Sequence, residues 1–376
     1  MQSTAVMTRA LSSILLVALL ACGSSAGSGA SSGEDGAPPG SGDDGGTPSS
    51  GQDGSAHDGP AGGDEGIPPP ASLDAGHEEG GPTLDAQTDG SSGGPGVYGS
   101  DGPNPVGTAT VQVPGPSGTF SVTAYYPMSP GAHPVVILSS GFFQTGLGYA
   151  PYAKRLASWG IATFTRDDPG LGETAPSIAA DVAYMVTTWL PAAAGDASTP
   201  AFGAVDTMRI GLAGHSRGGQ VALLAAEGGA LGHVRGVFGL DPVDTSTNGS
   251  PEARTQIAAI GVPLAFVGET TDSASSGCAP ATDNYQVLYQ AAVSPAVAIT
   301  AMNADHTMFE DPSNCSFCTL CTAGTATAAQ VLAYSVRYLA AFFARELLGD
   351  SSVGAAFQGA GAGQDVAAGL VQVVSK

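Results

Sequence analysis

The chain has 376 residues, with 33 acidic residues against 11 basic ones and a formal net charge of −22. This acidic balance lacks the basic patch that nucleic-acid binding requires, so no nucleic acid is expected as a partner. The length is sufficient for one large domain, but the composition divides the chain into unequal parts. Nothing in the sequence indicates an oligomeric state.

The first segment has the layout of an export signal. Its apolar run, residues 11–20, is too short to span a bilayer and predicts a signal peptide over residues 1–21. The stretch Leu19-Leu20-Ala21-Cys22 resembles the lipobox of bacterial lipoproteins, in which the cysteine is lipidated. This resemblance implies a membrane anchor at Cys22 and an outer-membrane or cell-surface location in a Gram-negative bacterium. The alternative is an ordinary signal peptide with an incidental cysteine.

Residues 22–105 consist mainly of Gly, Ser, Asp, Pro and Ala. Such a segment cannot bury enough apolar surface to offset its conformational entropy, so disorder is expected. A flexible chain of this length has a reach of about 50 Å. We interpret the segment as a tether that carries much of the negative charge.

Residues 106–350 have the composition of one folded domain. The expected strands are 110–113 and 120–125, which form a hairpin, then 133–140, 161–165, the strand before Gly214, 237–241, 262–268 and 296–301. The expected helices are 150–159, 178–190, one directly after Gly218, and 327–348. This alternation predicts an α/β fold with a mostly parallel sheet and helices on both faces. In such sheets the ligand site lies beyond the carboxyl ends of the strands. The Gly/Ala-rich tail, 351–376, is left without an assigned structure.

The segment Gly214-His215-Ser216-Arg217-Gly218 matches the G-x-S-x-G pattern of a nucleophile elbow, with an apolar strand before it and a helix after it. A serine on such a sharp turn stands at a helix N-terminus, close to free backbone N–H groups. The pattern predicts Ser216 as a nucleophile. The alternative is a plain glycine turn.

A nucleophilic serine needs an imidazole to take its proton and an acceptor to orient that imidazole. Asp241 follows the next expected strand, and His306 follows the strand 296–301 and precedes the last helix. This is the serine, acid, histidine order of α/β-hydrolases. Glu269, after the strand 262–268, is the alternative acid, and His306 could instead be a surface-loop histidine.

Four motifs together resemble chlorophyllase and its bacterial relatives in the α/β-hydrolase superfamily: residues 214–219, 239–244, 278–280 and 305–311. The likeness covers about residues 130–350. It implies an α/β-hydrolase fold, ester hydrolysis, and the aspartate before proline, Asp241, as the acid. The stretch Gly239-Leu240-Asp241-Pro242 also resembles the acid site of pancreatic-type lipases.

The oxyanion hole is expected to use the backbone N–H groups of Arg217 and Phe142. The family usually has His-Gly-X where this chain has Ser140-Gly141-Phe142, but a backbone donor does not depend on the histidine. Phe142, Phe143 and Met308 could line an apolar pocket or simply belong to the core. Asp167 and Asp168 follow a strand, and we assign them no role beyond capping a loop.

Besides Cys22 the chain has Cys278, Cys315, Cys318 and Cys321. In an oxidising compartment four cysteines favour two disulfides, with Cys278 bonded into the 315–321 loop beside His306. The pairing itself stays open. A four-thiolate zinc site is the alternative.

These patterns predict a serine carboxylester hydrolase that acts on a small-molecule or lipid-like ester with a hydrophobic moiety, without a metal or cofactor. Two alternatives remain: a non-catalytic envelope lipoprotein that uses the fold as a binding scaffold, and an acyltransferase. Fold alone does not separate them.

Overall fold

The computed structural model describes residues 97–194, 196, 205–227, 232–246, 252–274, 277–293, 295–315, 318–319, 321–353 and 362–376. The expected signal peptide, Cys22 and residues 23–96 of the expected tether lie outside these residues. The expectation of disorder is wrong for the end of the tether, residues 97–105, because Tyr98 is 4% exposed in a hydrophobic core and its hydroxyl donates to Asp350 at 2.6 Å. In the described part of the chain, no helix is both long enough and apolar enough to cross a membrane.

One nine-stranded sheet organises the described residues, in the order β1-β2-β4-β3-β5-β6-β7-β8-β9. The pairings from β4 through β8 are parallel, whereas β1–β2, β2–β4 and β8–β9 are antiparallel. The strands are β1 (Val106–Gly115), β2 (Gly118–Pro127), β3 (His133–Ser139), β4 (Ala162–Arg166), β5 (Val205–His215), β6 (Val234–Leu240), β7 (Leu264–Glu269), β8 (Ala296–Ala301) and β9 (Val371–Ser375). The predicted α/β class with a mostly parallel sheet is confirmed.

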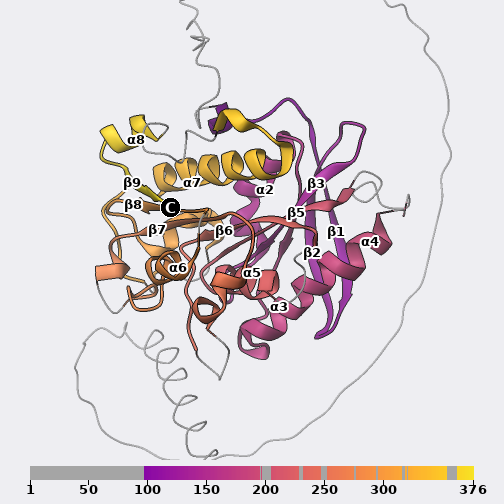
Figure 1. Ribbon diagram of the computed structural model, residues 1–376, viewed down its shortest axis with the longest axis horizontal. Coiled ribbons are helices and arrows are strands. Elements are labelled where there is room, and N and C mark those ends of the chain that lie inside the picture. Colours follow the sequence, from indigo (N-terminus) through magenta and orange to yellow (C-terminus); the bar gives the residue numbers. More distant parts are fainter. Residues whose placement is uncertain are drawn as a thin grey trace, which may run out of the picture. The chain divides into compact units, whose positions relative to one another are not determined.

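Helices cover both faces of this sheet (Figure 1), with α2 and α7 on one face and α3, α5 and α6 on the other. The α-helices are α2 (Ala150–Ser158), α3 (Ala175–Tyr184), α4 (Leu190–Ala193), α5 (Arg217–Glu227), α6 (Tyr285–Ala291), α7 (Ala328–Phe343) and α8 (Gly363–Ala367). Two π-helical turns, η4 (Met185–Trp189) and η12 (Ala344–Leu348), extend α3 and α7. The 3₁₀ turns are η1 (Val97–Gly99), η2 (Gly146–Tyr149), η3 (Gly170–Gly172), η7 (Ala253–Thr255), η8 (Ile257–Ala259), η9 (Asp272–Ala274), η10 (His306–Phe309) and η11 (Pro312–Asn314).

The two cores follow from the alternation of side chains along each strand. In β3, Val135 and Ile137 join the core under α3 and α5, whereas Val136 and Leu138 join the core under α2 and α7. All four are at most 1% exposed. A continuous apolar strand is therefore buried on both faces, as a central parallel strand requires.

The sheet continues beyond residue 350, where the sequence analysis ended the domain. Strand β9 pairs antiparallel with β8 and places the buried side chain of Val371 in the core under α7. The short Val371–Ser375 run is weak as a local signal, because only its pairing with β8 makes it a strand. The hairpin is also longer than expected, since β1 and β2 leave only Pro116 and Ser117 between them.

Candidate active site

The sharp turn between β5 and α5 carries Ser216 in the left-handed region, at φ 54°. A Cβ atom added at Gly214 would lie 2.1 Å from the carbonyl oxygen of Gly218, and one at Gly218 would lie 2.2 Å from that of Ser139. Both contacts are too close for any side chain, so only glycine fits at these two positions of the motif. The strand–turn–helix context that the motif predicts is present.

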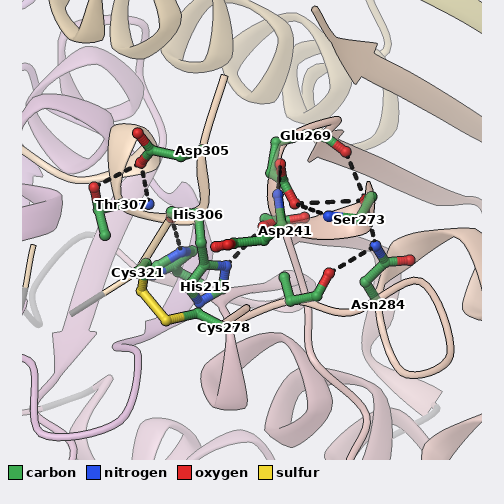
Figure 2. Close-up of polar contacts among 12 residues, drawn as sticks. His215, Asp241, Glu269, Ser273, Cys278, Asn284, Asp305, His306, Thr307 and Cys321 are labelled. Atoms are coloured by element: carbon green, nitrogen blue, oxygen red, sulfur yellow. Dashed lines mark hydrogen bonds and ion pairs between the residues drawn. A yellow bond between two sulfur atoms is a disulfide. The ribbon is translucent and has the colours of Figure 1, made fainter. Parts of the chain in front are cut away.

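Asp241 and His306 contact each other at the carboxyl end of the sheet (Figure 2). Asp241 directly follows β6, and His306 is the first residue of η10, after β8. The Nδ1 atom of His306 lies 2.6 Å from Oδ2 of Asp241, with the two residues 6% and 0% exposed. The structure therefore brings together two of the three residues that the sequence analysis selected as a triad.

Asp305 holds the turn that carries His306. Its Oδ1 atom accepts a hydrogen bond from the backbone N–H of Thr307 at 3.0 Å, as the N-cap of η10. Its Oδ2 atom accepts another from the N–H of Gly324 at 2.7 Å, which ties the turn to the chain that leads into α7. The position of the His306 backbone is thus fixed from both sides.

His215 connects this turn to the elbow and to the loop after β3. Its ring centroid lies 4.6 Å from that of His306, and its Nε2 atom lies 3.0 Å from the His306 carbonyl oxygen. Its Nδ1 atom lies 2.8 Å from the hydroxyl of Tyr149, which accepts a hydrogen bond from the N–H of Gly141 at 3.0 Å. A Cβ added at Gly141 would lie 3.4 Å from Cβ of Ser216. The three loops therefore meet around Ser216.

Glu269, the alternative acid, is the last residue of β7, and its side chain is hydrogen-bonded to the turn that directly follows. Its Oε2 atom accepts a hydrogen bond from the N–H of Asp272 at 2.8 Å, and its Oε1 atom accepts one from that of Ser273 at 3.0 Å. Figure 2 shows Glu269 and Ser273 beside Asp241. Of the two candidate acids, Asp241 is the one hydrogen-bonded to His306.

Burial dominates the electrostatics of these groups. It lowers the pKa of His306 to about 4, so the imidazole is neutral near pH 7, as a general base requires. It also raises the pKa of Asp241, and it raises the pKa of Glu269 to about 8, with the charge of Asp241 as the second cause for Glu269. A negative charge on Asp241 therefore disfavours ionisation of Glu269.

The expected oxyanion donors lie at the start of α5 and on the loop after β3. The N–H of Arg217 is the first of α5 and so lies outside the hydrogen-bond ladder of that helix. Phe142 and Phe143, after β3, are each 39% exposed, whereas Met308 is 8% exposed and packs in the core under α7. Met308 is therefore a core residue.

Three side chains without a predicted site role hold these loops: Tyr149, Asp168 and Glu310. Glu310 Oε1 lies 3.1 Å from Nδ1 of His215, and Asp168 accepts a hydrogen bond from the N–H of Phe143 at 3.0 Å. For Asp168 the signal in the sequence was its position, because it follows β4 at the edge where ligand sites form.

Two disulfides, Cys278–Cys321 and Cys315–Cys318, join the cysteines of the folded part. The first links the segment before α6 to the chain after η10, so Cys278 is bonded into the 315–321 loop as expected (Figure 2). Asp272 lies close to Cys278 and Cys321, but disulfide sulfurs are not thiolates and this cluster lacks metal-binding chemistry. The four-thiolate zinc alternative is therefore wrong for these cysteines.

Comparison with known proteins gives the family of this chain. The family model of chlorophyllase matches residues 101–356, which is well over half of the chain. None of the curated proteins matches the chain. The matched range contains the elbow, both candidate acids and His306. The chain therefore belongs to the chlorophyllase family, within the α/β-hydrolase superfamily.

Proposed function

We propose that this protein is a serine carboxylester hydrolase in which Ser216, His306 and Asp241 act as a catalytic triad. The observation that carries the proposal is the 2.6 Å contact between His306 Nδ1 and Asp241 Oδ2, next to a serine at φ 54° on a nucleophile elbow. Membership of the chlorophyllase family supports ester hydrolysis as the reaction class.

In the first half-reaction, the Ser216 oxygen attacks the ester carbonyl while His306 takes its proton. Asp241 accepts a hydrogen bond from His306 Nδ1–H and stabilises the imidazolium that forms. The N–H groups of Phe142 and Arg217 hold the oxyanion, and His306 then protonates the departing alcohol. In the second half-reaction, water attacks the acyl-enzyme with the same groups in the same roles, and the acid is released.

The exposed rings of Phe142 and Phe143 support an ester with a hydrophobic moiety as the substrate, because they present apolar surface beside the elbow. The lipobox-like stretch before Cys22 supports export and attachment to the outer membrane. Radiolabelled palmitate should label the wild-type chain in a Gram-negative host. No label should enter a Cys22→Ser variant. Equal labelling of the wild type and the variant would contradict lipid attachment at Cys22.

The hydrolase proposal is tested with purified protein on p-nitrophenyl esters from acetate to palmitate, with Ser216→Ala as the paired variant. We expect turnover and fluorophosphonate labelling in the wild type and neither in the variant. A variant that keeps its activity contradicts the proposal. Labelling of Ser216 without release of acid, but with transfer to an added alcohol, would identify an acyltransferase instead.

A further inference from the structure

The side chain of Arg217, the residue after the expected nucleophile, is directed to the loop after β4. Its Nε atom donates to Oδ2 of Asp168 at 2.7 Å, and its Nη2 atom pairs with Oδ1 of the same carboxylate. Nη2 also donates to the carbonyl oxygen of Gly170 at 2.9 Å, and Nη1 donates to that of Glu173 at 3.2 Å. The two charged side chains are 17% and 2% exposed. A buried ion pair of this kind is tolerated because the bidentate geometry satisfies both groups.

Asp168 also binds the loop after β3 that carries the other expected oxyanion donor. Its Oδ1 atom accepts a hydrogen bond from the N–H of Phe143 at 3.0 Å, and its own N–H donates to the carbonyl oxygen of Gln144 at 2.9 Å. Phe143 has φ 58°, a region that a phenylalanine rarely adopts. These two hydrogen bonds hold the backbone directly after Phe142 in that unusual conformation.

The guanidinium group of Arg217 lies over the ring of Phe142, 4.4 Å from its centroid. Stacking of this kind attracts the cation to the face of the ring. Phe142 is therefore held twice, through its own ring by Arg217 and through the next residue by Asp168.

Together these contacts connect two N–H groups that are 75 residues apart in the chain. We propose that Asp168 and the Arg217 side chain form an oxyanion clamp, a positioning pair that holds the N–H of Phe142 in register with the N–H of Arg217. This inference rests on the proposed function. A lysine at 217 cannot replace the arginine, because a point charge cannot make the bidentate contact and the stacking at once.

The clamp is tested in the full-length protein with Asp168→Asn, Arg217→Gln, Arg217→Lys and the double variant Asp168→Asn/Arg217→Gln. The matched control is Arg209→Gln, which breaks the Arg209–Asp206 pair and a hydrogen bond to the Leu347 carbonyl oxygen, in the N-terminal half of β5. Each protein is assayed for kcat and KM on one p-nitrophenyl ester. Each is also assayed for inhibition by an alkyl boronic acid, whose adduct on Ser216 places an oxygen in the oxyanion position, and for its melting temperature.

We expect kcat to fall about 10- to 100-fold in each clamp variant, somewhat less than complete loss of an oxyanion donor. KM should change by less than about threefold, because the lost interaction belongs to the transition state. Boronic acid affinity should fall in parallel with kcat, and the double variant should lose no more than the worse single one, since the pair acts as a unit. Arg209→Gln should retain wild-type kcat and boronic acid affinity.

Unchanged kcat and boronic acid affinity in Asp168→Asn would overturn the clamp, and so would a loss confined to KM. If Asp168→Asn melts below the assay temperature, Arg217→Gln, at the more exposed partner, decides between these outcomes. A wild type without Ser216-dependent turnover would remove the proposed function and the clamp together. Failure of the clamp alone leaves wild-type turnover intact.

Discussion

The carboxylate of Asp241 and the imidazole of His306 meet at 2.6 Å although they are 65 residues apart in the chain. Both follow parallel strands, β6 and β8, which are separated in the sheet only by β7. Glu269, at the end of that intervening strand, is buried beside them but bonds to its own following turn. Asp241 and Glu269 are therefore buried carboxyl groups at the ends of adjacent strands that have different partners.

The first prediction separates the two carboxyl groups by activity. Asp241→Asn should lower kcat/KM about 10³- to 10⁴-fold, because the amide no longer favours the required tautomer of His306. Glu269→Gln should stay within about tenfold of the wild type, since its contacts are structural. The measurement is steady-state ester hydrolysis at pH 7.5. An equal loss in both variants would contradict this division of roles.

The second prediction concerns stability and pH. Burial raises the pKa of Glu269 from 4.5 to about 8, so in this interval the folded protein holds a proton that the unfolded chain releases. The free energy of unfolding should therefore decrease as pH rises through the interval. In Glu269→Gln the free energy of unfolding should decrease less over this interval, by at least about 1 kcal/mol. This amount corresponds to a pKa shift of less than one unit.

Urea unfolding of the wild type and of Glu269→Gln between pH 6.5 and 8 measures this effect. His306 acts in the opposite direction, because its pKa falls from 6.5 to about 4 on burial and its effect is confined to lower pH. Parallel curves for the two proteins above pH 6.5 would show that Glu269 does not carry the dependence.

The third prediction compares the two disulfides. Cys278–Cys321 spans 43 residues and Cys315–Cys318 spans only 3, so the longer bridge restricts the unfolded chain more. Loop-closure entropy corresponds to about 4 kcal/mol for the first and about 2 kcal/mol for the second. Paired Cys→Ser variants should therefore differ in melting temperature, with the Cys278/Cys321 variant lower. The reverse order would refute the chain-entropy explanation.

The fourth prediction tests the C-terminal strand. Val371 is 1% exposed and Val374 is 53% exposed, although both belong to β9. Val371→Asp should lower the free energy of unfolding by about 3 kcal/mol or more, because it buries a carboxyl group in an apolar core. Val374→Asp, the matched control, should stay within about 0.5 kcal/mol. Similar values for the two variants would show that β9 does not contribute to the core.

Much of this architecture could be predicted from local patterns. The run His133–Ser139 and the run Ala296–Ala301 are continuous apolar strands in the sequence and in the structure. The elbow was equally readable, because Gly214, Ser216 and Gly218 meet each other within five residues. Apolar runs and the elbow motif depend only on residues that are close together in the chain, so they can be recognised in the sequence.

Other features required contacts between distant segments. Asp241 follows a buried strand and Glu269 ends one, and the packing of the turn after β8 brought His306 to Asp241. The strand Val371–Ser375 exists because β8 offered an open edge, and the partner of Cys278 depended on where the 315–321 loop lies. Asp168 shows the same limit, since its hydrogen-bond partners Phe143 and Arg217 follow two other strands, β3 and β5. Such pairings are set by the free energy of the assembled fold, in which burial and hydrogen bonding select among local alternatives that the chain alone leaves nearly equal.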